Sequence, residues 1–328
     1  MRICLVGPGI MSIPPEGWGG VEALIWNYKI ELEKQGHEVL IQNKWLGNNL
    51  EVDPVIIDKA INEINDWDPD FVHLHYDHYS DIMPRINAVK AITSHYPYLD
   101  YPQKRAGYEW IFHKFCLNHS NIFTLSELNS YHFSQFGAKK ELLWEWIYGV
   151  NSSSFAFKEN ASLHDRTICL GKIEPRKQQF VLQSLNENID FAGPLADPRF
   201  QRDDKSYLGT WSRDQVYNEL TNYANMVLFS DGEAAPQVTA EALLSGIGLV
   251  VSKEASANLD GSLPFIDIVD RNSVTAIELK QIIKANRENS LKHRKEIRAY
   301  GLENFDISKC VKKYVEKIQD LIKEDDSI

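Results

Sequence analysis

The feature that most constrains the fold is a rhythm of short apolar runs, each followed by a segment with helical periodicity. The first run, RICLVG at residues 2–7, is continuously apolar and ends at a glycine, the pattern of a buried parallel strand. Residues 19–39 then place apolar side chains at helical spacing before a stop signal at Gly36. Strand-like runs return at 38–43 and 70–76. This order predicts a parallel sheet with helices on both faces.

The rhythm continues and then restarts after a break. Further strands are predicted at 88–94, 121–125 and 142–147, and helices within 52–66 and 105–118. Residues 148–165 lose periodicity and are rich in serine and asparagine, which indicates a linker. Beyond it, strands are predicted at 167–173, 188–194, 205–211, 226–231 and 247–252. An amphipathic helix over 308–324 ends the pattern.

Length and composition agree with two domains of a soluble α/β protein. The 328 residues exceed one ordinary core, since domains run to roughly 100 to 200 residues. We therefore expect a first domain at 1–150, completed by the C-terminal helix at 306–328, and a second at 151–305. The net charge of −11, without a strong basic patch, argues against nucleic-acid binding.

Cysteine usage and the N-terminus indicate a cytoplasmic location. The four cysteines are far apart and form no C-x-x-C pair, which suits free thiols in a reducing compartment. The opening MRICLVGPG is too short for the apolar core of a signal peptide. No segment approaches the roughly 18 apolar residues of a membrane span.

Two segments at expected strand ends carry groups that suit an anion. Gly19 and Gly20 directly precede the first helix, where small residues and helical N–H groups admit a phosphate, although the same glycines suit an ordinary sharp turn. In LGKIEPRKQ, Gly171 ends a strand and cations follow it. The strand end raises the expectation that Lys172 and Lys177 line a ligand site, whereas Arg176 is assigned to solvent.

A third segment, DGEAAPQVTAEAL at 231–243, carries two carboxylates. Pro236 suits the first turn of a helix, so Glu233 is expected in the preceding loop and Glu241 about one and a half turns into the helix. Stabilisation of the helix dipole explains Glu233 tolerably and Glu241 poorly. The two glutamates are therefore expected to contact different parts of one ligand.

Histidines and acidic residues give weaker signals. His95 follows a short strand and can present a ring nitrogen to a cleft, but a lone histidine is more often structural. His73 and His75 occupy alternating strand positions with no third ligand to indicate zinc. No metal site is predicted.

Together these segments resemble glycosyltransferase family 4, the retaining nucleotide-sugar glycosyltransferases. The resemblance covers nearly the whole chain, in order, and its most specific block is EAAPQVTAE, two glutamates with seven residues between them. It implies a GT-B fold, with two Rossmann-like doubly wound domains facing a cleft and a C-terminal helix crossing back to the first. It also implies sugar transfer from a UDP- or GDP-sugar to a sugar, lipid-linked or small-molecule acceptor, in glycan, glycolipid or polysaccharide synthesis, without a cofactor or metal.

The resemblance also implies roles for individual residues. Glu241 would hold the ribose hydroxyls and Glu233 would lie by the sugar hydroxyls. Lys172 and Lys177 would neutralise the diphosphate, and His95 would contact the sugar from the opposite domain. The remaining donor-binding positions are Gly19, Gly20, Gly171, Pro236, Gln237 and Val238.

Three departures from the family pattern and two alternative functions accompany this interpretation. Lys172 stands where the family usually has arginine, Gln178 where glycine is usual, and 234–236 lacks the usual aromatic residue. A sugar-nucleotide-binding protein without catalysis and a GT-B-like nucleotide-sugar epimerase are the alternative functions. Residues 101–119, which interleave cations with aromatic residues, suit either weak contact with lipid headgroups or a helix with an apolar core face.

Overall fold

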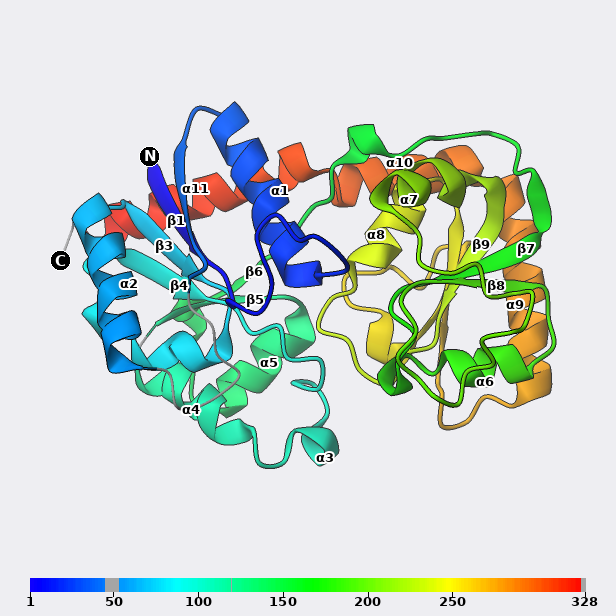
Figure 1. The fold of residues 1–328 in the computed structure, drawn as a ribbon, viewed down its shortest axis with the longest axis horizontal. Helices are drawn as coiled ribbons and strands as arrows, with labels where there is room; N and C mark the ends of the chain where they lie inside the picture. Colours follow the sequence, from blue (N-terminus) through cyan, green and yellow to red (C-terminus); the bar gives the residue numbers. More distant parts are fainter. Residues whose placement is uncertain (45–52, 119, 326–328) are drawn as a thin grey trace. The chain divides into compact units, whose positions relative to one another are not determined.

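The structure, a computed structural model, describes residues 1–44, 53–118 and 120–325. The chain divides into two compact units, one made of Met1–Tyr148 with Ile307–Ile328 and the other of Gly149–Asp306 (Figure 1). The expected first domain included residues 326–328, which lie outside the described residues. Each unit is built on its own parallel sheet, as the alternation of strands and helices predicted.

The first unit has a six-stranded parallel sheet in the order β2-β1-β3-β4-β5-β6. Its strands are β1 (Arg2–Val6), β2 (Glu38–Gln42), β3 (Phe71–Leu74), β4 (Val89–Ile92), β5 (Asn121–Thr124) and β6 (Leu143–Glu145). Its helices are α1 (Gly20–Lys34), α2 (Pro54–Trp67), α3 (Pro102–Arg105), α4 (Glu109–Leu117), α5 (Glu127–Gln135) and α11 (Ile307–Asp325).

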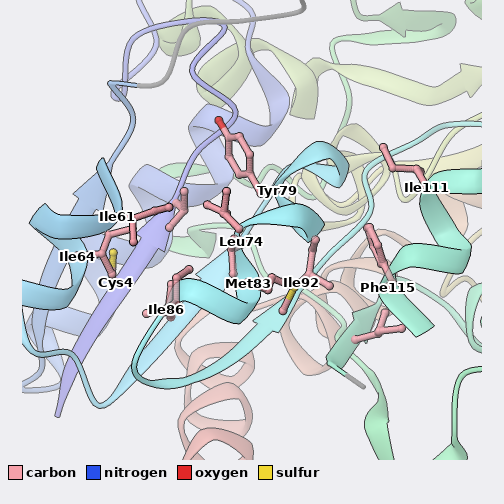
Figure 2. Packing of buried hydrophobic residues seen from close by; sticks show 14 of the residues in the cluster. Cys4, Ile61, Ile64, Leu74, Tyr79, Met83, Ile86, Ile92, Ile111 and Phe115 are labelled. Carbon is pink, nitrogen blue, oxygen red and sulfur yellow. The ribbon is translucent and has the colours of Figure 1, made fainter. Parts of the chain in front are cut away.

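Alternation along the strands divides this unit into two buried layers. Cys4, Leu74 and Ile92 point into a core that also contains Ile64 of α2 and Phe115 of α4 (Figure 2). Because side chains alternate across a strand, the neighbouring strand residues belong to the opposite face. That opposite face contains a polar group, His73, whose exposed fraction is 0%.

The opposite face is covered by α1 and by the last helix, α11, which packs against α1 and β4 (Figure 1). Tyr314 of α11 is fully buried, with its ring against those of Tyr28 and Trp146. Its hydroxyl is 3.0 Å from Nδ1 of His73. The C-terminal helix therefore belongs to the first unit, which confirms its predicted return.

The second unit has a five-stranded parallel sheet in the order β11-β10-β9-β7-β8. Its strands are β7 (Leu163–Leu170), β8 (Ile189–Ala192), β9 (Tyr223–Leu228), β10 (Gly248–Ser252) and β11 (Ile266–Val269). Its helices are α6 (Gln179–Ser184), α7 (Arg213–Glu219), α8 (Gln237–Leu244), α9 (Ala276–Lys292) and α10 (Arg294–Asn304), and a short 3-10 turn, η5 (Pro175–Lys177), precedes α6. Capping boxes at Ser212 and Thr275 fix the starts of α7 and α9.

Three local predictions differ from the structure. Residues 205–211 form no strand, and Tyr207 makes only an isolated bridge to Phe191, because Gly209 takes a left-handed φ of 76°. Strand β11 was missed, and β7 begins inside the expected linker. The helix expected at 105–118 is present as α4, which begins only after Gly107, whose φ is 86°.

Candidate functional site

The second sheet contains a point where the chain reverses its direction of strand addition. From β7 the chain adds β8 on one side and then returns to place β9 on the other. In open α/β sheets, ligands bind outside the carboxyl ends of the strands at such a switch point. The segments that follow β7 and β9 therefore mark the candidate site, and they contain most of the residues predicted for it in this unit.

The centre of this site is the carboxylate of Glu233, in the loop between β9 and α8. Its Oε2 is 2.8 Å from Nη1 of Arg176, and its Oε1 is 3.2 Å from Nζ of Lys177. The hydroxyl of Ser230 donates to the same Oε1 at 2.8 Å. Only 11% of the Glu233 side chain is exposed. A nearly buried carboxylate thus sits between two cations.

The cations decide the ionisation of Glu233. Burial raises the pKa of its carboxyl group, but the charges of Lys177 and Arg176 outweigh burial and leave the pKa below its ordinary value. Glu233 is therefore ionised at neutral pH. Its charge is balanced locally by the two neighbouring cations, Lys177 and Arg176.

Arg176, which the sequence assigned to solvent, is part of this cluster. Its Nη1 also donates to the carbonyl oxygen of Gly232 at 2.5 Å, and its Nη2 donates to Glu174 at 2.6 Å. Its own carbonyl accepts from the N–H of Asp231 at 2.8 Å. Arg176 thus ties the η5 turn to the loop after β9. The sequence missed it because its partner Glu233 is remote along the chain.

The other predicted cation, Lys172, lies at the edge of this arrangement. Its side chain is 52% exposed, and its Nζ is 3.6 Å from Glu174. Gly171 lies closer to the centre, with a left-handed φ of 140°. A Cβ atom at Gly171 would be 3.2 Å from Nζ of Lys177, so glycine leaves the space that the lysine occupies.

Glu241 lies in α8, apart from the Glu233 cluster in its contacts. Its exposed fraction is 4%, and its Oε1 accepts from Nη2 of Arg213 at 2.7 Å. The Arg213 guanidinium in turn lies over the ring of Tyr217. The two glutamates therefore have separate partners. Glu233 lies in a loop and Glu241 in a helix, as their positions in the sequence predicted.

The start of α8 differs slightly from expectation. Pro236 is the N-cap and has extended backbone angles, so the helix begins at Gln237 and Val238 falls in its first turn. No acidic side chain lies in that turn. The positive end of the helix dipole is therefore not neutralised within its own first turn.

The predicted residues of the first unit lie at the carboxyl ends of β1 and β4. Gly19 is the N-cap of α1 and Gly20 its first residue. A Cβ atom at Gly19 would meet Oε2 of Glu22 at 2.6 Å, whereas one at Gly20 would meet nothing within 4 Å. Position 19 is therefore more crowded than position 20, but the crowding comes from the ends of the flexible Glu22 and Met11 side chains, so the fold alone does not require glycine at either position.

His95 follows β4 and pairs with a second histidine. Its Nε2 is 3.2 Å from Nδ1 of His75, which follows β3. Burial lowers the pKa of His95 to about 4 and that of His75 well below its ordinary value. Both rings are therefore neutral at physiological pH.

The segment proposed for lipid contact contributes much of its apolar surface to the core. Phe112 and Phe115 are fully buried, and Arg105 donates to Glu109 and to the carbonyl of Leu99. Trp110 is 44% exposed. These contacts fit the alternative of a helix with an apolar core face; residue 119 lies outside the described residues.

Across residues 1–44, 53–118 and 120–325, no cluster of three or more histidine, cysteine or acidic side chains is arranged to hold a metal ion. Within the same ranges, no helix combines the length and apolarity needed to cross a bilayer.

The chain has the GT-B fold: two doubly wound units, with a C-terminal helix that returns to the first. Solved structures are similar to it over nearly its full length. No protein-family model and no curated protein matches the sequence. The chain is similar to sucrose-phosphate synthase from Thermosynechococcus elongatus (TM-score 0.77, 14% identity, 98% of this chain and 99% of that one). It is also similar to AviGT4, a glycosyltransferase involved in avilamycin A biosynthesis (0.69, 17%, 98% of each chain). A third similar structure is Anabaena HepE in complex with UDP and glucose (0.69, 13%, 98% and 100%). At these identities the likeness establishes the fold.

Proposed function

We propose that this protein is a retaining glycosyltransferase of family 4 type, which transfers a sugar from a nucleotide-diphosphate sugar to an acceptor. The observation that carries the proposal is the cluster of Glu233, Lys177 and Arg176 at the switch point of the second sheet. The similar HepE structures contain UDP with glucose and UDP-glucose, which favours a UDP-sugar over a GDP-sugar as the donor.

The charges of the site suit the departure of a nucleoside diphosphate. Cleavage of the bond between sugar and phosphate builds negative charge on the leaving oxygens. Lys177, held in place by Glu233, supplies a fixed positive charge, and the N-terminal end of α8 supplies a second one. Positioned cations and dipoles stabilise such charge without a resident metal ion.

Glu241 is proposed to hold the ribose hydroxyls of the donor. A buried carboxylate accepts two hydroxyl hydrogen bonds well, provided that its orientation is fixed. Arg213 donates to Oε1 and so fixes that orientation. The exposed fraction of the Arg213 side chain, 45%, leaves room for contact with the nucleotide as well.

The remaining roles complete the proposal. Glu233 receives the donor-sugar hydroxyls, His95 contacts the transferred sugar, and the loop at Gly20 approaches the phosphates. The acceptor is a sugar, a lipid-linked sugar or a small molecule. All four cysteines are free thiols, which supports a cytoplasmic location. We further propose weak membrane contact through residues 101–119.

A donor screen tests this function. The full chain is heated with UDP-, GDP- and ADP-sugars, because a ligand at 100 times its dissociation constant adds about 2.7 kcal/mol of stability. The stabilising donor is then incubated with a panel of sugar acceptors, and the anomeric configuration of the product is read by NMR. We expect a stabilising UDP-sugar and a product that retains the donor configuration.

One variant tests the donor site, and two results would favour the alternative functions. Glu241→Gln should weaken donor binding, while Lys295→Met, at an exposed ion pair with Glu159 in the same unit, should leave it unchanged. Stabilisation by a donor without turnover on any acceptor would favour a binding protein. An epimerised sugar from donor alone would favour the epimerase.

A further inference from the structure

We infer that His75 is a positioning residue for His95: the hydrogen bond between the two rings couples the tautomer of His95 to that of His75, and so affects whether Nδ1 of His95 donates or accepts a hydrogen bond. The inference rests on the proposed function, in which His95 contacts the transferred sugar. Its physical basis is the hydrogen bond between Nδ1 of His75 and Nε2 of His95, 3.2 Å long. No local sequence pattern links the two residues, which follow adjacent parallel strands.

The hydrogen bond between His75 and His95 couples the tautomers of the two rings. Both rings are neutral because burial lowers their pKa values, so each ring carries a single N–H group. One proton lies between the two nitrogens. If His75 donates it, His95 must carry its own proton on Nδ1; if His95 donates it, Nδ1 of His95 is a bare acceptor. His75 therefore couples its own tautomer to the chemistry of Nδ1 in His95.

His75 is itself held by a neighbour whose tautomer the structure determines. The ring of His73 lies 4.0 Å from that of His75, centroid to centroid. The hydroxyl of Thr93 donates to the carbonyl of Phe123 at 2.8 Å, so it must accept from Nε2–H of His73 at 2.8 Å. Nδ1 of His73 then accepts from the Tyr314 hydroxyl at 3.0 Å.

This bonded ring limits how His75 can move. His73 uses both nitrogens on fixed partners, and its exposed fraction is 0%. The Trp146 ring lies 5.6 Å from that of His75, and only 3% of His75 is exposed. The imidazole of His75 is therefore confined, which is what an orienting partner requires.

Two substitutions at position 75 separate the hydrogen bond from packing. In His75→Asn the amide group takes a place near that of Nδ1, whereas His75→Phe keeps a ring and loses the hydrogen bond. We expect His75→Phe to lower kcat about 10- to 100-fold, the usual cost of removing the partner that orients a functional histidine. The donor KM should change by less than about threefold, because other residues hold the nucleotide.

Recovery in the asparagine variant distinguishes orientation from stability. We expect His75→Asn to regain kcat to within about threefold of the unmodified protein, even if its unfolding temperature is the lower of the two variants. Loss of kcat that follows the unfolding temperature in both variants would overturn the inference. Unchanged kcat in His75→Phe would overturn it as well.

A second readout does not depend on activity. Nitrogen-15 NMR of the histidine-labelled full chain reports which nitrogen of His95 carries the proton. We expect the tautomer population of His95 in His75→Phe to differ from that in the unmodified protein, because phenylalanine neither donates to Nε2 of His95 nor accepts from it. An identical tautomer population in His75→Phe would refute the inference. If no donor is turned over but the tautomer changes as expected, the proposed function fails and the role of His75 stands.

Discussion

Replacement of Lys177 by methionine tests whether the cation beside Glu233 serves catalysis or only the fold. Methionine keeps most of the apolar stem and removes the charge. At 3.2 Å, the attraction between Nζ and Oε1 is about 5 kcal/mol for an effective dielectric constant near 20. Loss of one partner from a buried pair usually costs about 3 to 5 kcal/mol, since the other charge is left uncompensated.

The remaining contacts of Glu233 reduce that cost. Arg176 at 2.8 Å and Ser230 at 2.8 Å still compensate its charge, so we expect Lys177→Met to lower the free energy of unfolding by about 2 kcal/mol. The matched control is Lys295→Met, because its ion pair with Glu159 is exposed at both ends and worth at most about 1 kcal/mol. Denaturant unfolding measures both changes.

Activity should respond far more than stability. If Lys177 stabilises charge on the leaving diphosphate, its loss should lower kcat about 100- to 1,000-fold, as for other positioned charge-stabilising groups. The assay is release of nucleoside diphosphate at saturating donor, at a temperature where both variants are folded. A kcat in Lys177→Met within about threefold of that in Lys295→Met would refute the assignment of Lys177 to the leaving group.

Four further substitutions probe other parts of the structure. The pKa of Glu233 is lower in the folded protein than its unfolded value of about 4.3, so its ionised form stabilises the protein above that pH, and this contribution is lost as pH falls through the folded-state pKa. The difference in free energy of unfolding between the unmodified protein and Glu233→Gln should therefore be constant from neutral pH to about pH 5 and then shrink. A difference that grows in acid would contradict this. Tyr314→Phe leaves a buried histidine nitrogen without its donor and should cost about 1 to 3 kcal/mol in denaturant unfolding, so an unchanged stability would argue against the hydrogen bond. Gly193→Ala would place a Cβ atom 2.0 Å from the carbonyl oxygen of Gly171 and should prevent soluble expression or lower the unfolding temperature sharply, whereas Gly209→Ala, with no atom within 4 Å, should carry only the strain of its left-handed backbone.

The sequence predicts the buried strands well because parallel strands covered on both faces must be continuously apolar. RICLV in β1 and GLVVS in β10 have this pattern and are buried. The four-residue β11, IDIV, was missed because it is an edge strand and its partly exposed Asp267 interrupts the run. In YLGTW, by contrast, Trp211 is buried at 6% exposure without any strand, so apolarity there reflects packing.

The site was predictable where its residues are neighbours along the chain and not where the fold brings them together. The separation of Glu233 from Glu241 follows from the helix start between them, which local signals reveal. The pairing of Arg213 with Glu241 joins residues 28 positions apart, and no periodicity encodes it. The contact of Arg176 with Glu233 depends on β7 lying next to β9, which is a property of the strand order.

The position of α11 in the first unit has a consequence for biosynthesis. The second unit is formed by one continuous segment, whereas the first needs residues from both ends of the chain. Tyr314, which packs against Tyr28 of α1, and the buried Ile318 reach their places only after everything before them has been translated. Since domains fold as units during synthesis, the segment 149–306 can fold on the ribosome while the first sheet still lacks a covering helix. Truncation near the C-terminus therefore exposes the interior of the unit that is synthesised first.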